Sequence, residues 1–168
     1  MTDISPVIAD PTLVMFGKII LALLLGVIIG TERSVVARQA AGMRTFGLVS
    51  MGAALFFLTA NFVDQQYLGI VNFEPMFVVT GIVTGIGFIG GGLIIFKGDT
   101  VHGITTAAGL WVSTAVGLAV ATGLYSIAIF TTLLTILVFT GMWYVEQRFK
   151  HWFIERNDSD DQPNRLSG

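Results

Sequence analysis

The residues that could carry chemistry lie in two short polar stretches of an otherwise apolar chain. The first comprises residues 31–45 and the second residues 97–106, and each combines charged side chains with threonines. If both stretches lie at the same end of a helix bundle, they could converge into a charged pocket at its mouth. The alternative is that they are solvated loop charges that fix topology. The polar cluster predicted in this way is Glu32, Arg33, Arg44, Thr45, Asp99, Thr105 and Thr106.

The sequence argues against most enzyme and metal chemistry. It contains no cysteine and only two histidines, His102 and His151, so a thiolate nucleophile is excluded and a histidine-rich metal site is not expected. No nucleophile elbow or phosphate-binding loop is present. Asp64 and Glu74 could attract a cation, but two carboxylates in one link are weak evidence. We therefore expect a non-enzymatic protein with no catalytic residue, metal site, cofactor or nucleic-acid partner.

The composition is that of a membrane protein. Hydrophobic residues make up 54% of the 168 and charged residues only 12%, with a mean hydropathy of +0.79, whereas an ordinary soluble domain carries about 25% charged residues. About 20 apolar residues at ~1.5 Å each cross the ~30 Å hydrocarbon core of a bilayer. The chain has five stretches of roughly that length, at residues 12–30, 46–63, 76–96, 103–121 and 124–145.

These stretches predict an all-α polytopic fold, a bundle of five transmembrane helices with a glycine-rich third helix. The five-helix domain is expected at residues 12–146. Residues 1–11 would form a short extracytoplasmic N-terminus, and residues 147–168 a short, partly disordered cytoplasmic tail. No predicted span contains Asp or Glu, the usual mark of an ion pathway, and this counts against a dedicated transporter.

The charge distribution predicts the orientation in the membrane. Apart from Lys18, every Lys and Arg lies in the 31–45 loop, at the Lys97 turn or in the C-terminal tail, whereas the N-terminus and the link at 64–75 carry only acids. The positive-inside rule then places the N-terminus outside and the C-terminus in the cytoplasm. Lys18 itself either snorkels to the headgroups or serves as a buried counter-ion.

Glycines are concentrated in the third predicted helix. Glycine costs about 1 kcal/mol relative to alanine in a helix interior, so such a run indicates a special role. One reading is close helix packing, because small residues let backbones approach, and Gly87→Leu should then destroy the packing. The other reading is a broken helix that lines a polar cavity. Small-residue faces also favour a homo-oligomer. The predicted packing positions are Gly81, Gly85, Gly87, Gly90, Gly91, Gly92 and Gly109.

Four ordered motifs resemble a known family. Residues 25–33 (LGVIIGTER) and 41–45 (AGMRT) resemble the opening signature of the MgtC/SapB family, and residues 85–92 (GIGFIGGG) and 102–112 (HGITTAAGLWV) resemble its later motifs. The five-span pattern extends the resemblance over nearly the whole chain. The resemblance implies that seven residues of this chain belong to the family signature, without assigning them a chemical role: Glu32, Arg33, Arg44, Thr45, Thr105, Thr106 and Trp111.

The resemblance implies a protein of the bacterial inner membrane linked to magnesium homeostasis, acid stress and virulence-type survival. Members of this family are viewed as modulators of other membrane proteins, ATP synthase among them, and this is the function that we expect. A small channel or transporter for magnesium or another cation is the alternative. The sequence departs from relatives in two ways: Phe77 and Gly81 stand where relatives often have arginine and glutamine, and only a short tail follows the fifth span.

Overall fold

The computed structural model describes residues 10–35, 39, 41–66 and 74–160, and over these residues the chain is almost entirely helical. Five helices each contain a stretch long and apolar enough to cross a membrane, so the predicted all-α, five-span fold is confirmed. The elements are α2 (Pro11–Val35), α3 (Met43–Gln66), α4 (Pro75–Leu93), β1 (Ile95–Lys97), β2 (Thr100–His102), α5 (Ile104–Ala121) and α6 (Tyr125–Asp160).

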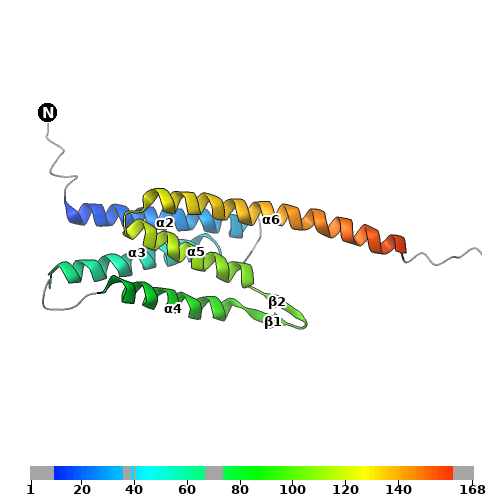
Figure 1. Cartoon of the computed structure of the whole chain (residues 1–168), viewed down its shortest axis with the longest axis horizontal. Coiled ribbons are helices and arrows are strands. Elements are labelled where there is room, and N and C mark those ends of the chain that lie inside the picture. The colour runs from blue at the N-terminus through cyan, green and yellow to red at the C-terminus, as the bar shows by residue number, and fades with distance from the viewer. Residues whose placement is uncertain (1–9, 36–38, 40, 67–73, 161–168) are drawn as a thin grey trace, which may run out of the picture.

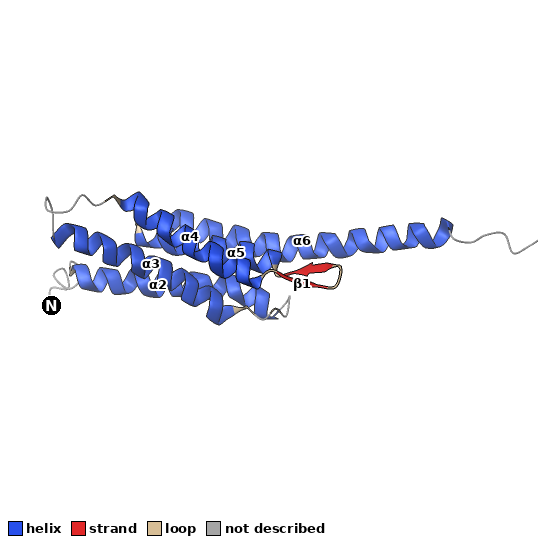
Figure 2. Cartoon of the chain, turned by 90° about the horizontal axis from the view of Figure 1, so that it is seen from below, coloured by secondary structure: helices blue, strands red, loops and turns tan. Residues whose placement is uncertain are grey.

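Successive helices run antiparallel along one common direction, and α6 extends well beyond the others (Figure 1). The β1–β2 hairpin projects from one end of the bundle, on the same side as the long extension of α6 (Figure 2). We call this the hairpin end. It also holds the last turn of α2 and the first turns of α3 and α5. The opposite end holds the start of α2, the start of α4 and the α5–α6 turn.

The first helix begins where the sequence indicates and ends later than predicted. The Thr12 N–H donates a hydrogen bond to Asp10 Oδ1 at 2.9 Å, and Pro11 occupies the first helical position. The hydropathy pattern predicts an end at Gly30, but the helix continues to Val35. Residues 31–35 contain neither glycine nor proline, so nothing local stops the helix. Glu32 and Arg33 therefore lie on a helix rather than in a loop.

The glycine-rich helix α4 is continuous from Pro75 to Leu93, so the broken-helix alternative is not observed. It ends three residues before the predicted limit of Phe96, because Ile94 adopts an extended conformation (φ −84°, ψ 110°). The following residues pair as an antiparallel hairpin, with Phe96 opposite Val101. Gly98 has a φ of +62° at the predicted turn, a value that glycine adopts without strain.

The fifth span is the start of a longer helix. The sequence predicts an end near Val145 followed by a partly disordered tail, but α6 continues to Asp160. Residues 147–160 are therefore helical, and the predicted boundary between membrane domain and tail falls within one continuous helix. Residues 157–160 lie within this helix, and the end of the predicted tail, 161–168, lies outside the described residues.

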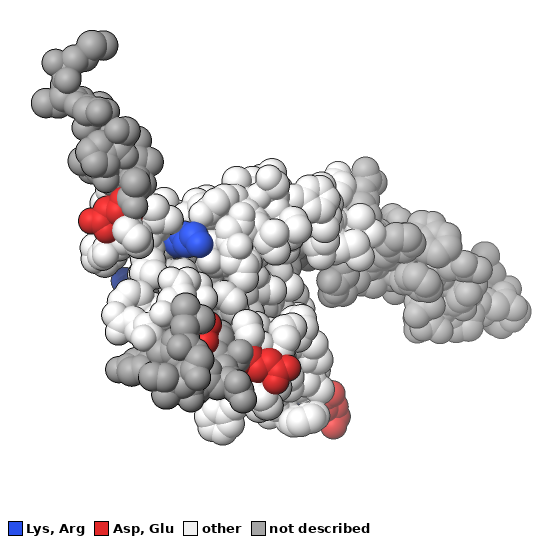
Figure 3. Space-filling view, turned by 60° about the vertical axis from the view of Figure 1, so that its left-hand side comes forward, with Lys and Arg blue, Asp and Glu red and all other residues white. Residues whose placement is uncertain are grey.

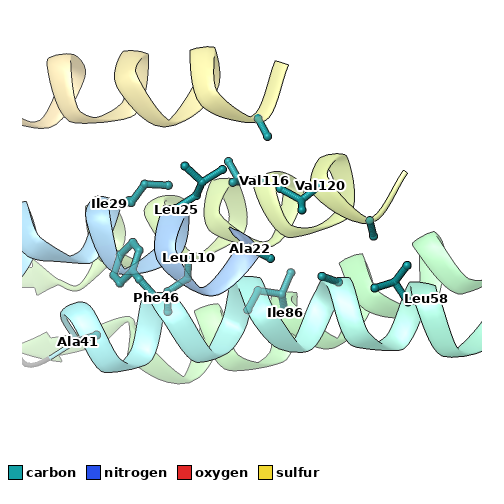
Figure 4. Close-up of a cluster of buried hydrophobic side chains, with 13 residues drawn as sticks. Ala22, Leu25, Ile29, Ala41, Phe46, Leu58, Ile86, Leu110, Val116 and Val120 are labelled. Carbon is teal, nitrogen blue, oxygen red and sulfur yellow. The ribbon is translucent and has the colours of Figure 1, made fainter. Parts of the chain in front are cut away.

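The core sits where α2, α3 and α5 meet. Phe46 of α3, Ile29 of α2 and Leu110 of α5 are each fully buried, and they point toward one another in Figure 4. Small residues let these helices approach closely: a Cβ added at Gly26 would lie 2.6 Å from the Phe46 carbonyl oxygen. Gly117 of α5 lies against the backbone of Ser50 in the same way. Direct contact between backbones therefore holds the three helices together.

The sides of the bundle are apolar. Large side chains such as Phe16, Phe56 and Phe130 are more than half exposed, and charged side chains are sparse over the face shown in Figure 3. A surface of this kind is unfavourable in water and is the expected one in contact with lipid tails. Together with the five apolar helices, it identifies a multi-pass membrane protein.

Candidate functional site

Two charged residues near the end of α2 are buried inside the bundle. Only 6% of Glu32 and 7% of Arg33 is exposed. The guanidinium of Arg33 reaches across to α5, where Nη2 donates a hydrogen bond to Thr106 Oγ1 at 2.9 Å. Its central carbon also lies 4.9 Å from the centroid of the Phe139 ring on α6. Arg33 therefore joins three helices through a hydrogen bond and a cation–π contact.

The hydrogen-bonding capacity of these two residues is not fully used. Glu32 Oε2 and Arg33 Nε are buried and have no hydrogen-bond partner among the described residues. Within the same residues no ion pair to Arg33 is formed. Leaving a buried donor on a charged group unsatisfied is costly, more so than for a neutral group. Arg33 Nε is thus available to an acceptor that is not part of the described chain.

Arg33 lines a cavity of about 520 Å³ between α5 and α6. The guanidinium contributes the charge, and Thr105 contributes a hydroxyl for which no hydrogen bond is formed within the described residues. The rest of the wall is mainly apolar: Ala108, Gly109, Val112, Leu134, Val138, Phe139 and Met142, with Thr131 and Thr135 between them. We call this space the Arg33 cavity. It combines one cation with a long hydrocarbon surface.

The structure brings together only part of the predicted polar cluster. Arg33 and Thr106 are in contact, with Glu32 buried beside them on α2. Arg44, Asp99 and Thr105 are exposed and Thr45 is half-buried, and within the described residues no hydrogen bond or ion pair joins these four to Arg33, although Thr105 lines the same cavity. Asp99 lies at the tip of the β1–β2 hairpin. A charged pocket formed by the complete cluster is therefore not observed.

Phe139 belongs to this site and is missed by sequence reasoning. It is one of thirteen phenylalanines in the chain, and nothing local distinguishes it from those that face lipid. Its role depends on how α6 packs against α2, which brings the ring against the guanidinium. The sequence indicates an aromatic partner only indirectly, through the arginine, because a buried cation in an apolar bundle is often placed over an aromatic face.

The predicted glycine positions differ in how closely they are packed within one chain. Among the described residues of one chain, nothing lies within 4 Å of a Cβ added at Gly81, Gly85, Gly87, Gly91 or Gly92, so these five glycines make no close contact inside the bundle, and close packing at Gly87 stays a prediction for contacts with another chain. Gly90 makes an ordinary contact, 3.5 Å from Ala107 Cβ. Gly109 is tightly enclosed: an added Cβ would lie 2.6 Å from Phe139 Cζ.

A second hollow runs between α3 and α4. It has a volume of about 650 Å³, and its wall is apolar except for Thr114. Gly81 and Gly85 form part of its α4 side, and Leu48, Ala53 and Phe56 part of its α3 side. We call it the α3–α4 groove. Because its lining includes half-exposed side chains of both helices, it faces the surroundings of the bundle rather than its core.

Lys18 is bonded to the end of a neighbouring helix. Its Nζ donates a hydrogen bond to the Ala121 carbonyl oxygen at 2.8 Å, at the last residue of α5. A cation at a helix C-terminus satisfies a free carbonyl and interacts favourably with the helix dipole. Lys18 therefore ties α2 to the end of α5.

The described residues contain no group of three His, Asp or Glu side chains that could hold a metal ion.

Comparison with known proteins places this fold in a family. The sequence model of the MgtC family matches residues 19–148. The chain is 37% identical to "Putative magnesium transporter YhiD" of Escherichia coli K12 over 122 residues, 69% of this chain and 56% of that protein. It is 43% identical to "Protein MgtC" of Brucella abortus over 111 residues, 66% of this chain and 44% of that protein.

The chain spans about half the length of the curated relatives that it matches. No solved structure matches it. The family match covers all five spans except the first turns of α2, and it includes Glu32, Arg33, Thr106 and Phe139. The chain belongs to the MgtC family.

Proposed function

We propose that this chain is a non-enzymatic protein of the bacterial inner membrane that modulates another membrane protein. The observation that carries the proposal is the unpacked outer face of α4. Of the five spans α4 is the least buried: 11% of its apolar stretch is buried inside the bundle, against 50% of that of α5. A helix with so little contact to its own bundle is available to a partner.

The residues of this face are suited to helix association. Gly81, Gly85, Phe88 and Gly92 recur at helical spacing, so they lie along one side of α4. Phe88 is 86% exposed, and the three glycines leave the helix backbone uncovered. In a bilayer, apolar surface alone does not drive association, but a glycine face lets a second helix approach closely enough for backbone contacts. The α3–α4 groove continues this surface onto α3.

The second candidate is a cation channel or transporter. It is supported by the buried carboxylate of Glu32 and by the name of the Escherichia coli relative, which refers to magnesium transport. Against it, the centre of the bundle is filled by apolar side chains. The buried hydroxyls of Ser113 and Thr114 already donate to the carbonyl oxygens of Phe46 and Leu110. Such an interior supports packing better than conduction.

Magnesium enters the proposal through the relatives. We propose that the modulation serves magnesium homeostasis and stress adaptation, because the names of the relatives refer to magnesium transport and to MgtC. The partner is another membrane complex, for which ATP synthase is a candidate, or a second copy of this chain. The hairpin end faces the cytoplasm in this proposal, since it holds Arg44 and Lys97.

The test is crosslinking from α4 in native membranes. The chain has no cysteine, so Gly85→Cys introduces a unique thiol, to which a maleimide-linked benzophenone is attached before irradiation. Leu137→Cys, at a 65% exposed position of α6, is the matched control. We expect a protein adduct from position 85 and none from position 137. An adduct with twice the 18.1 kDa mass of the chain would identify a homo-oligomer. Lipid adducts alone at both positions would contradict the proposal.

A flux assay separates the two candidates. Purified protein is placed in vesicles that contain a magnesium-sensitive dye, and the Glu32→Gln variant is measured in parallel. We expect no magnesium flux above that of empty vesicles. Flux that is lost in Glu32→Gln would replace the modulator by the transporter.

A further inference from the structure

We infer that the Arg33 cavity binds one anionic phospholipid, with the phosphate at Arg33 and an acyl chain along the gap between α5 and α6. This site is separate from the proposed partner face on α4. Its lining residues come from the end of α2 and from α5 and α6, whereas the α3–α4 groove is lined by α3, α4 and Thr114 of α5.

The cationic end of the cavity is suited to bind an anion. Arg33 is 93% buried, from its 7% exposure, and its Nε is a donor with no partner in the described chain. Thr106 accepts a hydrogen bond from Nη2 only. Glu32, the neighbouring carboxylate, does not line the cavity. A guanidinium presents its N–H groups as a planar fork that matches the oxygens of a phosphate, so Nε, which has no partner among the described residues, suits such a ligand.

The position of Arg33 along the bundle suits a headgroup. Arg33 is two residues before the end of α2, and Phe139 beneath it is close to Met142, the last residue of the apolar span of α6. The guanidinium therefore lies near the border between the hydrocarbon core and the headgroup layer. Arginines at this depth are stabilised by phosphate groups.

The remainder of the cavity suits an acyl chain better than a free anion. From Met142 to Thr131 the lining runs along α6 for about 16 Å, at 1.5 Å per residue. Leu134, Val138 and Met142 line this path and are each more than 40% exposed, so it opens sideways toward the membrane. Inorganic phosphate would contact Arg33 and Thr105 but leave the apolar wall uncovered. A phospholipid satisfies both parts at once.

The experiment measures lipid retention by native mass spectrometry of the purified full-length chain in detergent. Phosphatidylglycerol and phosphatidylcholine with identical acyl chains are titrated separately. We expect phosphatidylglycerol to bind with 1:1 stoichiometry and at least about tenfold more tightly, because both lipids carry the phosphate but the quaternary ammonium of phosphatidylcholine cancels its charge near Arg33. Equal affinities for the two lipids would overturn the inference. Displacement of phosphatidylglycerol by millimolar inorganic phosphate would identify a plain anion site and would also overturn it.

Two kinds of variant locate the lipid. Arg33→Gln should lower the affinity for phosphatidylglycerol about tenfold and that for phosphatidylcholine less, so that the preference for the anionic lipid is lost. Leu134→Trp fills the acyl path without touching Arg33, and Leu137→Trp on the same helix makes the same change outside the cavity. We expect the preference to be lost in Leu134→Trp and kept in Leu137→Trp. This pair tests the site even if Arg33→Gln fails to fold, and equal behaviour of the two tryptophan variants would overturn the inference.

Discussion

Arg33 and Thr106 are 73 positions apart in the chain, yet their contact organises the hairpin end of the bundle. A charged side chain in a membrane bundle is costly unless it is hydrogen-bonded, so such residues face protein rather than lipid. Thr106 supplies one acceptor, and the Phe139 ring lies against the guanidinium. The sequence identifies both polar residues as candidates, because their types are rare in apolar segments. The partner on α6 requires the packed structure.

At this scale we predict that Thr106→Val destabilises the protein by about 1–3 kcal/mol. Valine has nearly the same shape, but it removes the acceptor and leaves Arg33 Nη2 without its bond inside the bundle. Thr105→Val is the matched control, because Thr105 is exposed and is not bonded to Arg33. Thermal unfolding in detergent, followed by circular dichroism, measures both. Equal midpoints for the two variants would contradict the prediction.

At the scale of elements, the helices follow from local patterns and their contacts do not. Long apolar stretches with at most one charged residue predict all five spans, and Asp10-Pro11 predicts the start of the first one. The sequence predicts the glycine-rich segment as the closely packed one, but the closest contacts between the backbones of neighbouring helices involve Gly26, Gly30 and Gly117. A glycine permits close approach without requiring it. Whether another backbone arrives depends on helices elsewhere in the chain.

We predict that Gly26→Ala destabilises the bundle by about 1–3 kcal/mol. The new methyl group would lie 2.6 Å from the Phe46 carbonyl oxygen and 2.7 Å from Ser50 Cβ, so α2 and α3 must separate. Gly17→Ala on the same helix has nothing within 4 Å, and it should raise stability by up to about 1 kcal/mol through helix propensity. Unfolding in detergent measures both changes, which should have opposite signs. A stabilising Gly26→Ala would show that the two helices are not in backbone contact.

The outer face of α4 leads to a different prediction for Gly87→Leu. Since none of the described residues lies within 4 Å of a Cβ added at this position, leucine should leave the unfolding midpoint of the isolated protein unchanged. In native membranes Gly92→Leu, two turns from position 85 on the same side of α4, should abolish the crosslinks from Gly85→Cys, because it obstructs the surface proposed for the partner. A lowered midpoint would show that α4 is packed within one chain. Crosslinks that persist would show that the partner does not use this face.

At the scale of the whole molecule, the charges that the sequence assigns to one side of the membrane do lie at one end of the bundle. Arg33, Arg44 and Lys97 are at the hairpin end, and Asp64 and Glu74 are at the other end. The prediction from the loops and the arrangement of the helices agree in this respect. The proposal that the hairpin end faces the cytoplasm rests on the positive-inside rule.

We predict that Asp99→Cys and Gln66→Cys report opposite sides of the membrane. Both residues are exposed, and the chain has no other thiol to react. In right-side-out vesicles a membrane-impermeant maleimide should label the thiol at position 66 at once and the thiol at position 99 only after the membrane is broken. The reverse pattern would place the hairpin end outside and overturn the proposed orientation.

The sequence by itself determined that the chain lies in a membrane, how many spans it has and which polar residues are candidates for a site. Hydropathy and charge act locally, so a stretch of about 20 apolar residues crosses a bilayer whatever its neighbours are. The tertiary structure alone decided that Arg33 meets Phe139 above an apolar cavity and that the glycine face of α4 has no cover within one chain. These features depend on which helix faces are in contact. Contacts between helices arise from the packing of distant segments, which no local pattern encodes.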